Sequence, residues 1–163
     1  MPTAYSALPT NAPIPNGRVQ IKRGKADVGI NASSLAVGQK ITDSGGGFIE
    51  IFYTPTYDCW WVVRTQVLTV GISGGWQRCD WAIFITPADM NGVTRGYIHP
   101  CQCYDSGTVS WRTSSGSYAF RLRAGVTYNA YLGHQYRSGG EQQYHTGSAW
   151  TRIIGRVVGE GFV

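Results

Sequence analysis

Short segments that alternate apolar and polar residues occupy most of the chain after residue 47. In Ser117–Arg123, for example, the apolar residues stand at every second position, and a period of two indicates a β-strand with one buried face. Glycine-rich turns separate the segments, among them Asn91-Gly92, Ser115-Gly116 and Gly139-Gly140. The pattern predicts strands at Phe48–Tyr53, Cys59–Val70, Asp80–Thr86, Val93–His99, Thr108–Arg112, Ser117–Arg123, Val126–Gly133, Gln142–His145 and Ala149–Val158. It therefore predicts an all-β jelly-roll or β-sandwich of about eight strands.

The first 47 residues differ in composition from the rest. Of the 21 aromatic residues only Tyr5 precedes Phe48, and all the lysines lie before residue 48. Residues 1–47 have a net charge of +3, whereas residues 48–163 have a net charge of +2 from nine arginines and seven acids. We therefore expect two parts, an extended basic N-terminal arm (1–47) and a β-sandwich domain (48–163).

The arm allows two interpretations. It could become ordered on an acidic partner, in which case the partner-binding residues are Arg18, Lys22, Arg23 and Lys25. Alternatively, it is a tail with one edge strand near Arg18–Ile21 that packs on the sandwich. Composition separates these cases only loosely, because a segment poor in aromatic residues can still add a strand to a sheet.

Motifs that suggest an enzyme or a metal site lack their usual context. Gly71-Ile-Ser73-Gly-Gly75 matches the nucleophile elbow of hydrolases, but a further strand is predicted after it instead of a helix. His99-Pro-Cys101-Gln-Cys103 could place zinc ligands, yet its spacing is not that of a zinc knuckle, and buried thiols or a disulfide suit Cys59, Cys79, Cys101 and Cys103 better. We predict no catalytic residues, no metal and no cofactor.

Aromatic residues provide an alternative from another class. Six tryptophans and ten tyrosines on a β-sandwich could stack against sugar rings, although large aromatic side chains more often form cores and subunit interfaces. Nucleic acid is not an expected partner, because the body has little net charge and no nucleic-acid-binding motif. No apolar run reaches 18 residues and the N-terminus has no signal-peptide pattern, so we expect synthesis in the cytoplasm and no membrane insertion.

The C-terminal third carries a family resemblance. The segments 118–132, Gly139-Gly140, Tyr144-His145 and 150–161 resemble terminal domains of tailed-bacteriophage virion proteins, particularly minor tail proteins and head decoration proteins of phages that infect actinobacteria. The step Leu122-Arg-Ala-Gly-Val-Thr-Tyr128 also looks like the trimeric jelly rolls of the tumour-necrosis-factor type.

The resemblance implies a non-enzymatic structural component of a tailed-phage virion, a minor tail protein or capsid decoration protein, assembled as a homotrimer and bound to other capsid or tail proteins. The break in composition predicts that the N-terminal arm attaches it to the particle and that the β-sandwich is displayed on the surface. Host-surface glycan is a further partner under the alternative, in which the chain is a lectin-like, carbohydrate-binding β-sandwich module. Low charge and many aromatic residues suit a subunit buried in a symmetric assembly. The interface candidates are Arg121, Arg123, Arg152 and Arg156, whose spacing on two predicted strands would allow one stripe toward a carboxylate-bearing neighbour.

Overall fold

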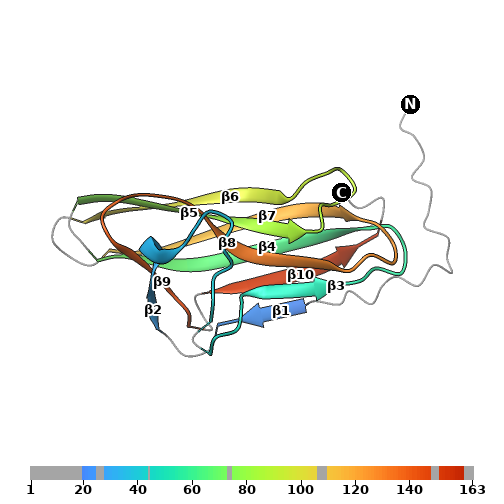
Figure 1. The fold of residues 1–163 in the computed structure, drawn as a ribbon, viewed down its shortest axis with the longest axis horizontal. Helices are drawn as coiled ribbons and strands as arrows, with labels where there is room; N and C mark the ends of the chain where they lie inside the picture. Colours follow the sequence, from blue (N-terminus) through green and yellow to red (C-terminus); the bar gives the residue numbers. More distant parts are fainter. Residues whose placement is uncertain are drawn as a thin grey trace.

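Antiparallel strands dominate the structure, a computed structural model that describes residues 20–24, 28–43, 45–72, 75–105, 110–147 and 151–159 (Figure 1). One turn of 3-10 helix, η1 (Ala32–Ser34), accompanies them. The strands are β1 (Gln20–Arg23), β2 (Gly29–Asn31), β3 (Glu50–Tyr53), β4 (Cys59–Gly71), β5 (Gly75–Thr86), β6 (Arg95–Asp105), β7 (Ser110–Leu122), β8 (Tyr128–Gly139), β9 (Gln142–His145) and β10 (Arg152–Val158).

Two sheets face each other. In the first, sheet A, the long strand β4 pairs with β7 along one edge and with β10 and then β9 along the other; β1 extends the sheet beyond β10, and β2 extends it beyond β9. Sheet B has the order β3-β8-β5-β6. Pro100 lies in β6, at the edge of sheet B, where the missing N–H of proline costs least. The described part of the chain is therefore the all-β sandwich that the alternating pattern predicts.

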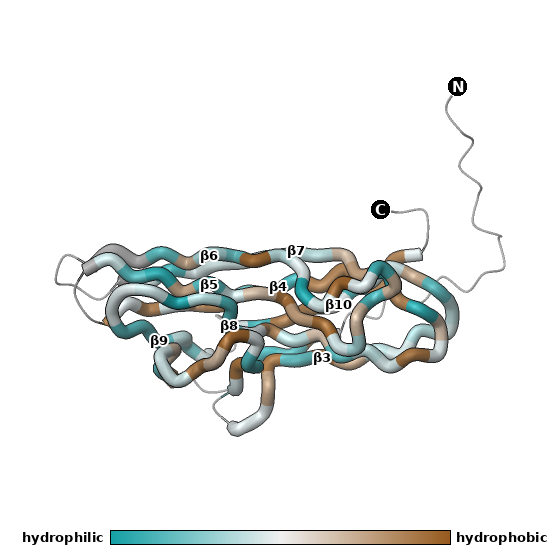
Figure 2. The backbone as a smooth tube through the Cα atoms, turned by 45° about the horizontal axis from the view of Figure 1, so that its top comes forward, coloured by the Kyte–Doolittle hydropathy of each residue, from teal (hydrophilic) through white to brown (hydrophobic). Residues whose placement is uncertain are grey.

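The core fills the space between the sheets. Its largest buried side chains include Trp61, Trp81, Phe120 and Tyr144. Along the backbone, hydrophobic and hydrophilic positions alternate, as the changing colour in Figure 2 shows. The tryptophans divide between core and surface, because Trp76 and Trp111 are each about half exposed, at 49% and 52%.

The edges of the two sheets meet where β6 and β7 lie side by side. The thiol of Cys101 in β6 donates a hydrogen bond to the carbonyl oxygen of Arg112 in β7. A Cβ atom on Gly116 would lie 2.7 Å from the ring of Tyr97 and 2.9 Å from that of His99. Gly116 is therefore a packing position inside a strand, and the turn predicted at Ser115-Gly116 is wrong, because residues 110–112 and 117–122 of the two predicted strands belong to one continuous strand, β7.

The predicted division after residue 47 does not coincide with the edge of the sandwich. β1 pairs with β10, β2 pairs with β9, and Ile41 is fully buried in the core. Residues 20–24 and 28–43 therefore pack on the sandwich, as in the second interpretation of the arm, while residues 1–19 lie outside the described residues. No helix in the described part is long and apolar enough to cross a membrane.

The burial of Ile41 allows a direct test of this packing. Replacing Ile41 with alanine should lower the free energy of unfolding by about 2–5 kcal/mol, because a fully buried side chain leaves a cavity. Val37 belongs to the same segment but is 67% exposed, so Val37→Ala should change stability by less than about 0.5 kcal/mol. Urea unfolding of both variants measures the difference; equal and small effects would mean that residues 28–43 do not contribute to the core.

Candidate functional site

The outer face of sheet A is built by alternation along three neighbouring strands. In β4, Trp61 and Val63 are fully buried, so Trp60, Val62, Arg64 and Gln66 point to the other side of the sheet. The register then determines which residues share that side, because cross-strand partners lie on the same face. Arg121 of β7 is opposite Trp60, and three residues of β10, Arg152, Ile154 and Arg156, are opposite Gln66, Arg64 and Val62.

The same reasoning adds β1. Arg23 is opposite Arg152 and Ile21 is opposite Ile154, whereas Lys22 is opposite the fully buried Ile153 and therefore points inward. We call the outward set of Arg23, Arg64, Arg121, Arg152 and Arg156 the arginine face.

Charge is distributed unequally between the two sheets. The six strands of sheet A contain seven basic residues and no Asp or Glu. Sheet B contains three arginines and three acids. Within the described residues, four members of the arginine face form no ion pair with a carboxylate: Arg23, Arg64, Arg152 and Arg156. Like charges on neighbouring strands destabilise a sheet, so this face is suited to a partner that brings negative charge.

An open hollow of about 480 Å³ lies in the middle of the arginine face. Arg64 and Arg152 contribute the charges, and the Nη2 of Arg152 donates a hydrogen bond to Oε1 of Gln66 at 2.9 Å. Tyr97, from the adjoining strand β6, is half exposed at one side of the hollow. The residues that line it are Arg64, Thr65, Gln66, Tyr97, Ser115, Gly116, Ser117, Arg152 and Ile154.

His99 joins three strands in the interior next to the hollow. Its Nε2 is hydrogen-bonded to Oγ1 of Thr65 at 3.0 Å and its Nδ1 to Oγ of Ser114 at 3.1 Å. Burial lowers the pKa of His99 to about 4, although Asp80 acts in the opposite direction. The imidazole is therefore neutral at physiological pH and serves as a structural link between β6, β4 and β7.

The other predicted site residues are placed differently. The Nζ of Lys22 lies 3.1 Å from Oδ2 of Asp43, whose Oδ1 accepts hydrogen bonds from the amides of Gly45 and Gly47. Burial acts to raise the pKa of Asp43, but Lys22 and the two amides outweigh it, so the pKa lies below its usual value. Lys22 thus holds β1 to the loop after residue 43, and the prediction that it binds a partner has no support in this geometry.

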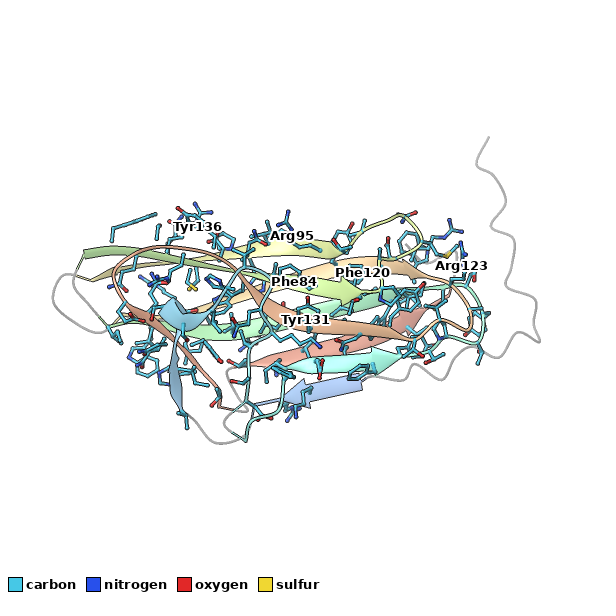
Figure 3. All side chains as sticks on the ribbon, viewed as in Figure 1. Phe84, Arg95, Phe120, Arg123, Tyr131 and Tyr136 are labelled. Atoms are coloured by element: carbon cyan, nitrogen blue, oxygen red, sulfur yellow. The ribbon has the colours of Figure 1, made fainter. Side chains whose placement is uncertain are left out.

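The remaining predicted residues are not all within the described part. Arg18 and Lys25 lie outside it, as does Ser73 of the Gly-x-Ser-x-Gly motif. Arg123 follows the end of β7 and is exposed at the opposite end of the sandwich from Tyr136 (Figure 3). Of the four interface candidates, the structure thus brings Arg121, Arg152 and Arg156 onto one face, whereas Arg123 lies just beyond the end of β7, two residues after Arg121.

Sequence reasoning missed Arg64 as a member of this face. The alternation in the predicted strand Cys59–Val70 already places Arg64 on the same face as Trp60 and Val62, because the three residues stand at every second position. What the sequence could not supply was the register that brings β10 and β1 beside β4.

Cysteines and titratable groups form no metal site in the part of the chain that the structure describes: no group of three or more His, Cys, Asp or Glu side chains is close enough to hold an ion. Cys59, Cys79 and Cys101 are buried and are present as thiols, one of the two states, thiol or disulfide, that the sequence analysis left open.

Two antiparallel sheets, one of six strands and one of four, pack face to face and define a jelly-roll β-sandwich. Among solved structures, the chain is similar to the Eiger TNF from S. frugiperda, with a TM-score of 0.54 and 11% sequence identity over 86% of this chain and 91% of that one. No family model matches the sequence, and no curated protein does. At this identity the likeness establishes the fold and no more.

The buried imidazole leads to a pH prediction. Because the pKa of His99 in the folded state, about 4, lies below its ordinary value of 6.5, the unfolded chain takes up the proton first as the pH falls. The contribution of neutral His99 to the free energy of unfolding is therefore complete above pH 6.5. Between pH 6.5 and pH 4 the free energy of unfolding should fall progressively, by roughly 3 kcal/mol.

Urea unfolding between pH 7 and pH 4 measures this loss. His99→Gln keeps groups that can hydrogen-bond Thr65 and Ser114 but does not titrate, so the variant should lose less stability than the wild type over the same range. His134, whose pKa burial also lowers, remains in both proteins and is cancelled by the comparison. If the free energies of unfolding of the wild type and of His99→Gln fell equally between pH 7 and pH 4, His99 would not be the neutral, buried group assigned here.

Proposed function

We propose that this protein is a non-enzymatic structural component of a tailed-phage virion, either a minor tail protein or a capsid decoration protein. In this role it forms a homotrimer on the particle surface and uses the end of the arginine face around Trp60, where Arg121 and Arg156 lie, to bind an acidic surface of another virion protein. The observation that carries the proposal is the charge segregation of sheet A, which has seven basic residues and no acid on its strands.

Docking is best supported at the end of the arginine face around Trp60. There Trp60, Val62 and Val158 give partly buried apolar area, and Arg121 and Arg156 flank it. An apolar centre with arginine around it is the composition of a protein interface. Arg23 lies at the other end of the face and belongs to the N-terminal segment that the sequence predicts to attach the protein to the particle.

Support for an oligomer comes from the apolar surface and from the fold. Among the described residues, eleven large hydrophobic side chains are exposed, including Phe52, Trp76 and Trp111. A subunit of a symmetric assembly would cover part of that area. The resemblance of the step Leu122–Tyr128 to trimeric jelly rolls favours three copies.

A carbohydrate-binding module is the second candidate function, and the half-exposed Trp76 and Trp111 favour it. The ring of Trp111 lies 4.7 Å from that of His145, which leaves its other surface open to a stacking ligand.

Particle composition tests the proposed function. We expect the protein in a fixed ratio to the major capsid or tail subunits in purified particles, and a mass of three chains by light scattering at micromolar concentration. Arg156→Glu should remain folded, because Arg156 is exposed, but should fail to join particles because it reverses charge in the docking surface. Arg137→Glu makes the same change at an exposed residue of sheet B, away from the arginine face, and should join normally.

Other outcomes would contradict the proposal. Absence of the protein from purified particles would exclude the structural role. If Arg156→Glu joined particles at the wild-type level, the arginine face would not be the attachment surface. If the protein were a monomer in solution, the proposed trimer would be wrong.

A further inference from the structure

The hollow on sheet A has the features of a ligand site. Its volume, about 480 Å³, lies in the range of small-molecule pockets, roughly 300–1,000 Å³. It is distinct from the Trp60 end of the face, because it is formed two and more residues farther along β4, at Arg64 and Gln66. A ligand there goes beyond the proposed structural role and does not depend on it.

Two arginines line the hollow. Arg152 is opposite Gln66 and Arg64 is opposite Ile154, so the two arginines are diagonal neighbours on adjacent strands, with Cβ atoms at most about 8 Å apart. The side chain of Arg64 is exposed, and neither arginine forms an ion pair with a described carboxylate. Guanidinium presents a planar fork of N–H donors that matches a carboxylate in two parallel hydrogen bonds.

The rest of the lining is neutral and polar. Ser115 and Ser117, from β7, are exposed hydroxyls, and Gln66 adds an amide. Hydroxyl and amide groups both donate and accept hydrogen bonds, as the hydroxyls of a sugar do. A ligand that forms hydrogen bonds with them carries several hydroxyls arranged around one negative group.

Tyr97 supplies the apolar wall. Its ring is 50% exposed and lies against Gly116, the position in β7 where a side chain would collide with it. A flat, half-exposed ring beside hydrogen-bonding groups can stack on the C–H face of a sugar ring and use its hydroxyl at the edge.

These features together define one ligand class. We propose that the hollow binds a carboxylate-bearing sugar, with the carboxylate on Arg64 and Arg152, the hydroxyls on Gln66, Ser115 and Ser117, and the ring against Tyr97. A phosphorylated ligand is a poorer match, because no helix N-terminus or glycine-rich loop of the described residues points amide groups into the hollow.

An array of neutral, carboxylated and sulfated glycans, probed with the full-length protein, tests the class. Binding should be confined to glycans that carry a uronic or sialic acid, and it should weaken with added salt because the contact is ionic. Binding to neutral glycans at equal strength would overturn the role of the arginines. Equal binding to sulfated glycans would overturn the carboxylate assignment, and an array without signal would overturn the site.

Variants locate the site. Arg152→Gln should lower the affinity for the strongest array ligand at least tenfold, as measured by calorimetry. Arg156→Gln is the matched control, because Arg156 lies on the same strand and face but two residues beyond Ile154, outside the hollow. Its affinity should stay within twofold of the wild type. Ser117→Asp places a carboxylate in the hollow at an exposed strand position and should abolish binding with the unfolding midpoint unchanged. Equal losses in Arg152→Gln and Arg156→Gln would overturn the site.

The two proposals fail separately. Arg152→Gln should join particles and form trimers as the wild type does, since it lies outside the Trp60 end of the face. Normal incorporation without glycan binding would reject only the sugar site, and glycan binding by a protein absent from particles would reject only the virion role.

Discussion

The burial of Trp61 constrains the arrangement on which the candidate site depends. Trp61 is fully buried between the sheets, and a Cβ atom on Gly155 would lie 2.5 Å from its Nε1 and 2.6 Å from Cδ1 of Ile51. Glycine at this position lets β10 approach β4 in the observed register. A shift by one residue would turn every side chain of β10 to the opposite face and bury Arg152 and Arg156. Core packing thus decides where the arginines point.

The same arrangement decides which basic residues have carboxylate partners. The inward basic residue of β1, Lys22, has a carboxylate partner in Asp43, and Lys40 has one in Glu50 at 2.5 Å. On the outer face of sheet A the described arginines have no such partner within the strands, which contain no acids. The cations that hold the N-terminal segment to the sandwich are therefore neutralised internally, while Arg23, Arg64, Arg152 and Arg156 form no ion pair with a described carboxylate and remain available for acidic ligands or neighbours.

Strand prediction succeeded where apolar and polar residues alternate, and it failed where a glycine could be either a turn residue or a close-packing residue inside a strand. The alternation of Ser117–Arg123 and Cys59–Val70 identified parts of β7 and β4 correctly. The sequence predicts a turn at Gly116 because glycine favours turns, but in β7 it provides room for Tyr97 and His99 from the other sheet. The division after residue 47 relied on aromatic content, yet small aliphatic residues such as Ile41 and the backbone pairing of β1 were enough to join the sandwich. Trp76 and Trp111 showed that the number of tryptophans does not tell which are buried.

The sequence by itself determined the β class, the side-chain alternation within each strand, and the absence of acidic residues from the segments that become sheet A. These are local properties, set by the period of two and by composition. Only the tertiary structure decided that β1, β10, β4 and β7 are neighbours, that Arg121, Arg152 and Arg156 join Arg64 on one face, and that Tyr97 borders the hollow. Strand order and register arise from packing between residues far apart in the chain, and no local pattern records which distant strands pair.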